Sequence, residues 1–143
     1  MRIKIVNTSS NPLPEYKTIG ASGMDLLSNN DQTITIKPME RTLIPTGLFL
    51  EIPVGYEGQV RARSGLSIKN GITLVNCVGT IDSDYRGELK IPIINLGDAP
   101  FDINKGDRVA QLIITKYDRI EWDQVESVED THRGIGGFGS TGI

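Results

Sequence analysis

The stretch Leu89-Lys90-Ile91-Pro92-Ile93 decides the fold class, because an apolar residue stands at every second position. A period of two places these residues on one face of an extended strand, whereas a helix needs a period of 3.6. The same pattern recurs at Ile3 and Ile5, at Ile34 and Ile36, at Val60 and Ala62, and within residues 108–115. Clusters of Gly, Pro, Asn and Asp separate these stretches, so we predict many short strands in an all-β sandwich or barrel.

The composition indicates one globular domain that is rich in turns. The 143 residues match the size of a single domain, and the 16 glycines and 7 prolines favour turns over a helical bundle. Hydrophobic residues make up 38% and charged residues 23%, which is typical of a folded chain and not of a disordered one. One short helix is predicted over residues 64–70, and Gly71 is expected to end it.

Charge and cysteine content exclude several classes of function. The net charge of −3 offers no basic surface to a nucleic-acid polymer. No apolar run approaches the roughly 18 residues of a membrane span, and the first residues lack the apolar core of a signal peptide. Cys77 is the only cysteine, which rules out an internal disulfide and predicts a reducing, cytoplasmic location. The only histidine, His132, gives little support to a histidine metal site or a Ser-His-Asp triad.

The last residues differ from the rest of the chain. Apolar residues are sparse from Ser127 onward, and half of residues 133–142 are glycine. We therefore predict a β domain over residues 1–126 and a mobile C-terminal arm over residues 127–143. The glycine-rich tract lacks the lysine and the flanking elements of a phosphate-binding loop. Phe138 is unexpected in a plain flexible tail, because its aromatic ring has no core to enter there.

A segment over residues 79–88 places two aspartates, a tyrosine and an arginine between glycines. One interpretation is a hairpin turn with solvated charges. The other is a site in which a carboxylate acts as a base and Tyr85 forms a flat wall beside a ring. Asp82 is the stronger candidate, because it follows the apolar Ile81 at an expected strand end, whereas Asp84 lies in the turn itself.

Two further segments carry polar residues with alternative interpretations. Arg61 and Arg63 precede the predicted helix, and Ser64 begins it. Together they form either a phosphate-binding site or two surface arginines followed by a helix N-cap at Ser64. Asp25 lies in a predicted strand within residues 21–28, where it is typical of a buried or capping acid. Cys77 has no neighbours that indicate a thiol nucleophile.

Taken in order, five segments resemble the trimeric deoxyuridine triphosphatases (dUTPases). They are Ala21-Ser-Gly-Met-Asp-Leu-Leu-Ser28, Val60-Arg-Ala-Arg-Ser-Gly-Leu-Ser67, Asn76-Cys-Val-Gly-Thr-Ile-Asp-Ser-Asp-Tyr-Arg-Gly-Glu88, Lys105-Gly-Asp-Arg-Val-Ala-Gln-Leu-Ile-Ile114 and Arg133-Gly-Ile-Gly-Gly-Phe-Gly-Ser-Thr-Gly142. The third and fifth are the most specific, and Arg61-Ala62 departs from the Ala/Val-Pro pair that is frequent in the family. The resemblance implies a jelly-roll-like β-clip fold with a flexible arm, and a homotrimer with three shared active sites.

The same resemblance implies hydrolysis of dUTP to dUMP and pyrophosphate with Mg²⁺, which limits uracil incorporation into DNA and supplies dUMP for dTMP synthesis. Asp82 matches the residue that activates water for attack on the α-phosphate. The phosphate contacts match Arg63, Ser64, Gly65, Gln111 and Arg133. The uracil and deoxyribose contacts match Asn76, Gly79, Ile81, Tyr85 and Phe138. Magnesium is expected to bind mainly through substrate phosphates and waters, with Asp25 supporting those waters.

Two other functions are alternatives to this one. A dCTP deaminase has a related fold, but it is expected to carry a catalytic glutamate and a Ser-Arg-Ser-Ser pattern, where this chain has Asp82 and Arg61-Ala-Arg-Ser64. A non-catalytic, nucleotide-sensing trimer is expected to have lost Asp82 or one of the phosphate and arm residues, and all of them are present. No nucleic-acid polymer or membrane is expected as a partner.

Overall fold

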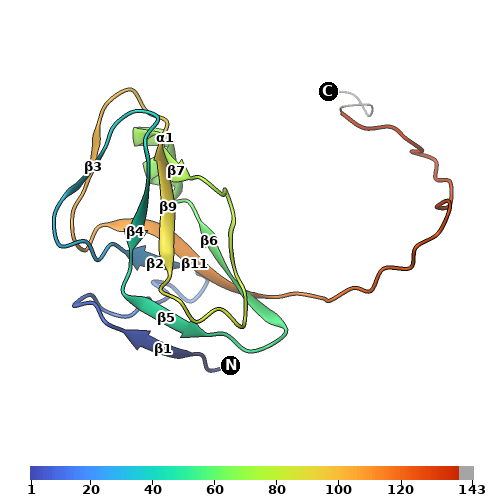
Figure 1. Cartoon of the computed structure of the whole chain (residues 1–143), viewed down its shortest axis with the longest axis horizontal. Coiled ribbons are helices and arrows are strands. Elements are labelled where there is room, and N and C mark those ends of the chain that lie inside the picture. Colours follow the sequence, from blue (N-terminus) through green and yellow to red (C-terminus); the bar gives the residue numbers. More distant parts are fainter. Residues whose placement is uncertain (139–143) are drawn as a thin grey trace.

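Eleven short strands and one helix are found in residues 1–138, the part of the chain that this computed structural model describes (Figure 1). The strands are β1 (Lys4–Asn7), β2 (Met24–Leu27), β3 (Ile34–Ile36), β4 (Arg41–Pro45), β5 (Leu48–Glu51), β6 (Tyr56–Arg61), β7 (Ile72–Leu74), β8 (Gly79–Ile81), β9 (Lys90–Asn95), β10 (Phe101–Ile103) and β11 (Arg108–Lys116). The helix α1 spans Ser64–Asn70. Within the described residues, no helix has both the length and the apolar character needed to cross a membrane.

All strand pairs in the described residues are antiparallel, and most join strands that are distant in sequence. The largest sheet has the order β2-β11-β6-β8, a second has the order β4-β9-β7, and two pairs, β1-β5 and β10-β3, complete the body. The connections therefore cross repeatedly between sheets, as they do in jelly rolls. The predicted all-β, jelly-roll-like fold class is confirmed.

The period-two pattern arises because one face of each strand enters a shared core. Leu89 and, in β9, Ile91 and Ile93 are almost completely buried, while Lys90 faces solvent. Both larger sheets contribute side chains to the core. Leu26, Val60 and Leu112 come from the β2-β11-β6-β8 sheet, and Ile44 and Ile72 come from the β4-β9-β7 sheet. Apolar burial of this kind is the main favourable term in folding, so the alternation in the sequence directly encodes which face points inward.

The helix begins and ends at the predicted residues, but its N-cap differs from the interpretation that placed Ser64 there. Arg63 occupies the N-cap with an extended backbone (φ −91°, ψ 123°), and no side chain caps the helix. Gly71 ends the helix in the left-handed region at φ 69°, a conformation that costs little only for glycine. Arg63 is therefore free to use its side chain elsewhere.

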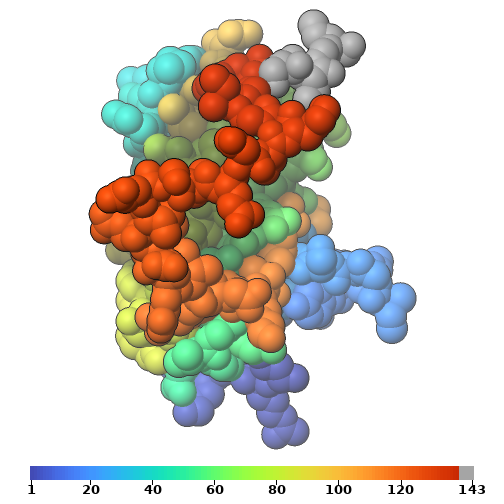
Figure 2. Space-filling model, turned by 90° about the vertical axis from the view of Figure 1, so that its right-hand side faces the viewer, coloured from blue at the N-terminus to red at the C-terminus, as the bar shows by residue number. Residues whose placement is uncertain are grey.

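The chain leaves the body after β11. Figure 1 shows the segment after Lys116 running away from the sheets in an extended path, and Figure 2 shows it crossing in front of the body when viewed from that side. Every residue from 118 to 135 is exposed. Of the arm predicted over residues 127–143, the last five residues lie outside the described part.

Candidate functional site

One face of the β2-β11-β6 sheet is polar and holds several of the predicted site residues. Asp25 of β2 lies directly opposite Gln111 of β11, and Gln111 lies opposite Arg61 of β6. The neighbouring positions Leu26 and Leu112 point the other way, into the core. Because directly opposed residues of antiparallel strands share a face, these polar side chains are gathered by the register alone.

Asp25 forms ion pairs with two arginines on this face. Its Oδ1 lies 3.0 Å from Nε of Arg63, and its Oδ2 lies 3.3 Å from Nη1 of Arg108. Arg63 also donates from Nη1 to the backbone carbonyl of Arg108 at 2.9 Å. Only about a quarter of the Arg63 and Asp25 side chains is exposed, at 26% and 23%. The result is a half-buried ion-pair cluster with one net positive charge, which suits an anionic ligand.

Gln111 is held in place beside this cluster. Its Nε2 donates to the carbonyl of Ala62 at 3.1 Å. A Cβ atom at Gly23 would lie only 2.6 Å from its Oε1, so a glycine at this position leaves the room that the amide occupies. Ser64 and Gly65 are exposed in the first turn of α1, directly after Arg63. The four predicted phosphate-binding residues of the body therefore lie in one region.

The predicted catalytic carboxylate lies in the loop that follows β8. The strand ends at Ile81, as predicted, and Asp82 is exposed in the turn. The turn is closed by a hydrogen bond from the Tyr85 amide to the carbonyl of Asp82 at 3.2 Å. Arg86 braces it further, because its Nη1 donates to the carbonyls of Ser83 at 2.7 Å and of Tyr85 at 2.9 Å.

Tyr85 is also fixed by its own side chain. Its hydroxyl donates to the carbonyl of Glu88 at 3.0 Å, and a Cβ atom at Gly87 would lie 2.3 Å from that hydroxyl. The ring therefore lies across Gly87 and leaves its other side exposed, at 46% for the residue. This geometry fits the predicted flat wall.

Asn76 and Gly79 lie next to each other at the other end of β8. A Cβ atom at Gly79 would lie 3.1 Å from Nδ2 of Asn76, and Gly79 pairs with the buried Val60 of β6. Cys77 is exposed between them with a positive φ of 47°. The hairpin thus presents backbone groups and one amide side chain beside a narrow turn.

The cation cluster and the catalytic loop of one chain do not meet. Ile81 pairs with Gly58, while Arg63 lies five residues further along from Gly58. At about 3.3 Å per residue, roughly 20 Å separate Asp82 from Arg63 along this sheet. The two groups of one subunit therefore cannot act on the same phosphorus atom.

The arm residues form a third separate group. Arg133 donates from Nε to the carbonyl of Gly136 at 2.8 Å, which is a contact within the arm itself. The side chain of Phe138 is completely exposed. Within residues 1–138, neither residue forms a hydrogen bond or an ion pair with the cation cluster or with the catalytic loop.

The side chains of the described residues fit a metal ion that is bound mainly by the phosphates of the substrate. In residues 1–138 no three His, Cys, Asp or Glu side chains are grouped as a metal cage. Both oxygens of Asp25 already face guanidinium groups. Mg²⁺ keeps several waters and prefers phosphate oxygens, so the absence of a cage in this part of the chain is compatible with such an ion.

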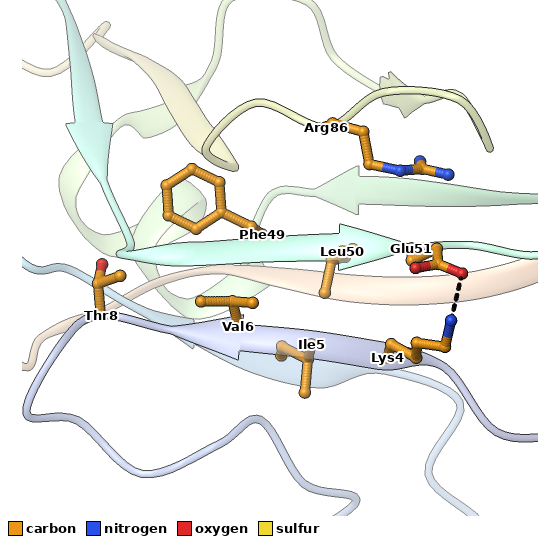
Figure 3. A pocket seen from close by; sticks show the side chains of 8 residues that line it. All are labelled: Lys4, Ile5, Val6, Thr8, Phe49, Leu50, Glu51 and Arg86. Carbon is orange, nitrogen blue, oxygen red and sulfur yellow. Dashed lines mark hydrogen bonds and ion pairs between the residues drawn. The ribbon is translucent and has the colours of Figure 1, made fainter.

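Several depressions lie outside the cation cluster, and two of them exceed 500 Å³. One, of about 540 Å³, adjoins the catalytic loop and is lined by Asp82, Asp84, Glu57, Tyr117 and Arg119, among others. The other is an apolar groove of about 520 Å³ over β1 and β5, where Val6 and Phe49 are register partners (Figure 3).

The apolar groove holds none of the predicted site residues. Lys4 and Glu51 form an ion pair of 2.9 Å at one end of it, and Arg86 lies above β5 (Figure 3). The hydrogen bond and the charge of Lys4 lower the pKa of the Glu51 carboxyl. In the described residues β1 pairs with β5 alone, so its outer edge is open. The groove is therefore better suited to a contact between chains than to catalysis.

Two residues of the site were not predicted from the sequence. Arg108 stands three positions before Gln111, so strict alternation would place them on opposite faces. The register shifts between Arg108 and Ala110, and this β-bulge puts Arg108 opposite Leu27, on the face of Asp25. Arg86 braces the catalytic loop through backbone carbonyls, a contact that leaves no pattern in the sequence.

The comparisons with known proteins agree with this geometry. The family model for dUTPase matches residues 9–142. The chain belongs to the dUTPase family. It is 61% identical over 142 residues to the deoxyuridine 5'-triphosphate nucleotidohydrolase of Finegoldia magna, with 99% of each chain covered. It is 53% identical to the Rickettsia felis protein of the same name, with 100% of this chain and 97% of the other covered.

Solved dUTPase structures share the fold. The Staphylococcus bacteriophage 80alpha dUTPase with dUPNHPP matches with a TM-score of 0.90 at 29% identity, covering 99% of both chains. A variant dUTPase of phage phi11 of S. aureus, described with a structural Mg(II) ion, matches with a TM-score of 0.80 at 27% identity, covering 89% of this chain and 98% of that one. The predicted family, fold and enzyme class are confirmed.

Proposed function

We propose that this chain hydrolyses dUTP to dUMP and pyrophosphate. The observation that carries the proposal is the cluster of Arg63, Asp25, Arg108 and Gln111, a preformed cationic site in a chain of net charge −3 from the dUTPase family. A triphosphate is strongly anionic, so local cations must reverse the sign of the field where it binds. The proposed location is the cytoplasm, as the single cysteine suggests.

The direct test is release of pyrophosphate from dUTP in the presence of Mg²⁺. We expect stoichiometric dUMP and pyrophosphate, and much slower release from dCTP and UTP. Ammonia released from dCTP would support a deaminase instead. Tight binding of dUTP without any product would support the nucleotide-sensing alternative.

Four body residues and one arm residue account for binding of the phosphates in this proposal. Arg63 supplies a guanidinium edge, Ser64 a hydroxyl, Gly65 a backbone with no side chain in the way, and Gln111 an amide. Arg133 of the arm adds a second guanidinium group at the far end of the triphosphate. Bonds between ionised donors and phosphate oxygens are the strong ones, so this set anchors the chain of phosphates.

Asp82 acts on the attacking water. Its carboxylate accepts a hydrogen bond from a water and holds that water in line with the α-phosphorus. Positioning dominates phosphoryl transfer, so orientation of the water is the main contribution of this residue. The proton of the water passes to the carboxylate as the bond to phosphorus forms and the pyrophosphate leaves.

Magnesium belongs to this proposal as a companion of the substrate. Phosphate oxygens and waters would supply most of its ligands, and the ion would neutralise phosphate charge when bound. Asp25 is the predicted residue beside those waters. That role stays a prediction, and the ion pairs of Asp25 with two arginines indicate a role beside Arg63 as well.

The hairpin around β8 selects the base. The backbone between Gly79 and Ile81, together with Asn76, offers N–H and C=O groups to uracil O4 and N3–H. Cytosine has a donor where uracil has O4 and an acceptor where uracil has N3–H. A site built for uracil would leave its own buried polar groups unpaired against cytosine, and such a mismatch lowers kcat/KM for the wrong base by about 10⁴-fold. The narrow turn excludes the methyl group of thymine, and Phe138 stacks over the uracil when the arm closes.

Tyr85→Ala is expected to raise the kcat/KM of UTP relative to dUTP by about tenfold or more. The ring lies across Gly87 and would block a 2′-hydroxyl, so its removal opens that space. Steady-state kinetics with both nucleotides measure the ratio. Tyr85→Phe keeps the ring and loses only the bond to Glu88, so it should retain discrimination; an unchanged ratio in the alanine variant would remove the steric explanation.

The proposed assembly is a homotrimer in which each active site draws on more than one subunit. The roughly 20 Å between Asp82 and Arg63 within one chain supports this sharing. The exposed Ile120, Trp122 and Val125 after β11, and the open edge of β1, are apolar or unpaired surfaces that a neighbouring subunit would cover.

Sedimentation is expected to show a particle of about three times the 15.6 kDa chain mass at working concentrations. Mixing inactive Asp82→Asn subunits with inactive Arg63→Gln subunits should restore part of the activity. Shared sites assembled from different chains can combine one intact copy of each group. A fully active monomer, or mixtures that stay inactive after subunit exchange, would contradict shared sites.

A further inference from the structure

Asp25 lies between two arginines that reach it from different elements. Arg63 comes from the N-cap of α1 and Arg108 from the start of β11, and each forms an ion pair with one oxygen of the carboxylate. We propose that Asp25 and Arg108 are positioning residues that hold the Arg63 guanidinium in its phosphate-binding orientation. This inference rests on the proposed function, and it assigns to Asp25 a role through Arg63 instead of through the metal.

The donors of Arg63 are divided between the protein and the ligand side. A guanidinium group has five N–H donors in a rigid plane. One Nη1 donor is used for the carbonyl of Arg108, while Nε lies 3.0 Å from Oδ1 of Asp25 in an ion pair. Two oxygen partners at different nitrogens fix the plane of the group, and no hydrogen bond from Nη2 is found within residues 1–138. Asp25 and the Arg108 backbone thus set the direction in which the remaining donors point.

Arg108 completes the support from the other side. The β-bulge in β11 turns it to the face of Asp25, where its Nη1 bonds Oδ2 at 3.3 Å. Without this second partner, the carboxylate could rotate and release Arg63. The Arg108 side chain is itself 56% exposed, so its removal should disturb the cluster and not the core.

Fixing Arg63 in advance matters because a long side chain loses considerable rotamer freedom when it binds a ligand. A guanidinium that is already held loses less on binding, and it presents its donors to the transition state without reorganisation. A misplacement of about 1 Å in a phosphate-binding group can cost about 10²-fold in rate.

The first test observes Arg63 without substrate. In ¹⁵N NMR of the full-length protein, the Nε–H of Arg63, assigned by its loss in Arg63→Lys, should exchange with water more slowly than that of the exposed Arg41. In Asp25→Asn the exchange should accelerate by about tenfold, because the guanidinium group loses the charged partner that holds it. Asp102→Asn removes the same charge on the distant β10 and serves as the matched control.

The second test is a double-mutant cycle with dUTP. Asp25→Asn should lower kcat/KM by about 10²-fold, and Arg108→Gln by about tenfold. Arg108→Gln should add nothing further in the Asp25→Asn background, because Arg108 acts through Asp25. The Mg²⁺ concentration for half-maximal activity should stay unchanged, and Arg41→Gln should have no effect. Thermal unfolding of each variant identifies any loss of fold.

Three outcomes would overturn the inference. If the losses of kcat/KM from the two substitutions were fully additive, Arg108 would contact the phosphates directly. A marked rise in the Mg²⁺ requirement of Asp25→Asn, with Arg63 exchange unchanged, would assign Asp25 to the metal. Unprotected Nε–H exchange at Arg63 in the wild type would show that the group is not held. A wild type that fails to hydrolyse dUTP would reject the proposed function, while the NMR result would still decide the role of Asp25.

Discussion

Replacement of Asp82 by asparagine is expected to lower the turnover of dUTP by about 10²–10⁴-fold while binding of dUTP remains nearly intact. Asparagine has the shape of aspartate but does not accept the proton of the attacking water. Asp82 is exposed, and only its backbone carbonyl makes a hydrogen bond in the described structure, so the fold should not change. Single-turnover release of pyrophosphate measures the chemical step, and calorimetry with a non-hydrolysable dUTP analogue measures binding.

Asp84→Asn is the matched control for this substitution. Asp84 is exposed in the same loop, two residues further along, and carries the same charge. We expect its replacement to leave turnover within a few-fold of the wild type, since the predicted in-line water lies at Asp82. A near-normal rate in Asp82→Asn, or an equal loss in both variants, would mean that another group is the base or that the loop acts only through its total charge.

The sequence predicted the body of the fold because burial and alternation are local signals. The pattern is uninterrupted from Leu89 to Ile93, and Leu89, Ile91 and Ile93 fill the core. The helix at Ser64–Asn70 was predicted from the stop signal of Gly71. The pairing of β2 with β11 was not predicted. The partners are more than 80 residues apart, and the sequence of neither strand indicates which strand it pairs with.

The candidate site shows the same division. Asp25, Arg63 and Gln111 stand in quoted segments, and the structure places them on one face. Their mutual contacts depend on long-range register and on a β-bulge, and neither has a periodic signature. Arg108 was overlooked for that reason. The separation of Asp82 from Arg63 is likewise a consequence of how β8 pairs with β6, which alternation alone does not determine.

Deletion of residues 127–143 is expected to preserve the assembly and the melting temperature but to reduce hydrolysis of dUTP by about 10²–10³-fold. The described residues of this segment are mostly exposed and contribute nothing to the core, so the body should fold without them. Arg133 would lose its bond to phosphate and Phe138 its stacking on uracil, the latter worth about 1–3 kcal/mol. Kinetics, sedimentation and thermal unfolding of the truncated chain test each part.

The single variants Arg133→Gln and Phe138→Ala separate the two ends of the ligand. Ordering the arm opposes closure by about 1–2 kcal/mol for each residue that becomes fixed, and glycine is the most costly residue to order. Closure therefore needs contacts at both the phosphates and the base. Either variant alone should reproduce most of the loss of activity that the full deletion causes. Two independent, additive losses would indicate static contacts in place of a closing arm.

A fluorescent probe can follow closure directly. Phe138→Trp introduces an indole at the position that is expected to cover uracil, and Trp122→Phe removes the native tryptophan, which is 90% exposed. A non-hydrolysable dUTP analogue should change the emission strongly, and dUMP should change it less, because it lacks the terminal phosphates that Arg133 would bind. An equal response to dUMP and to the triphosphate analogue would show that the base alone closes the arm. Full activity of the truncated chain would remove the arm from catalysis altogether.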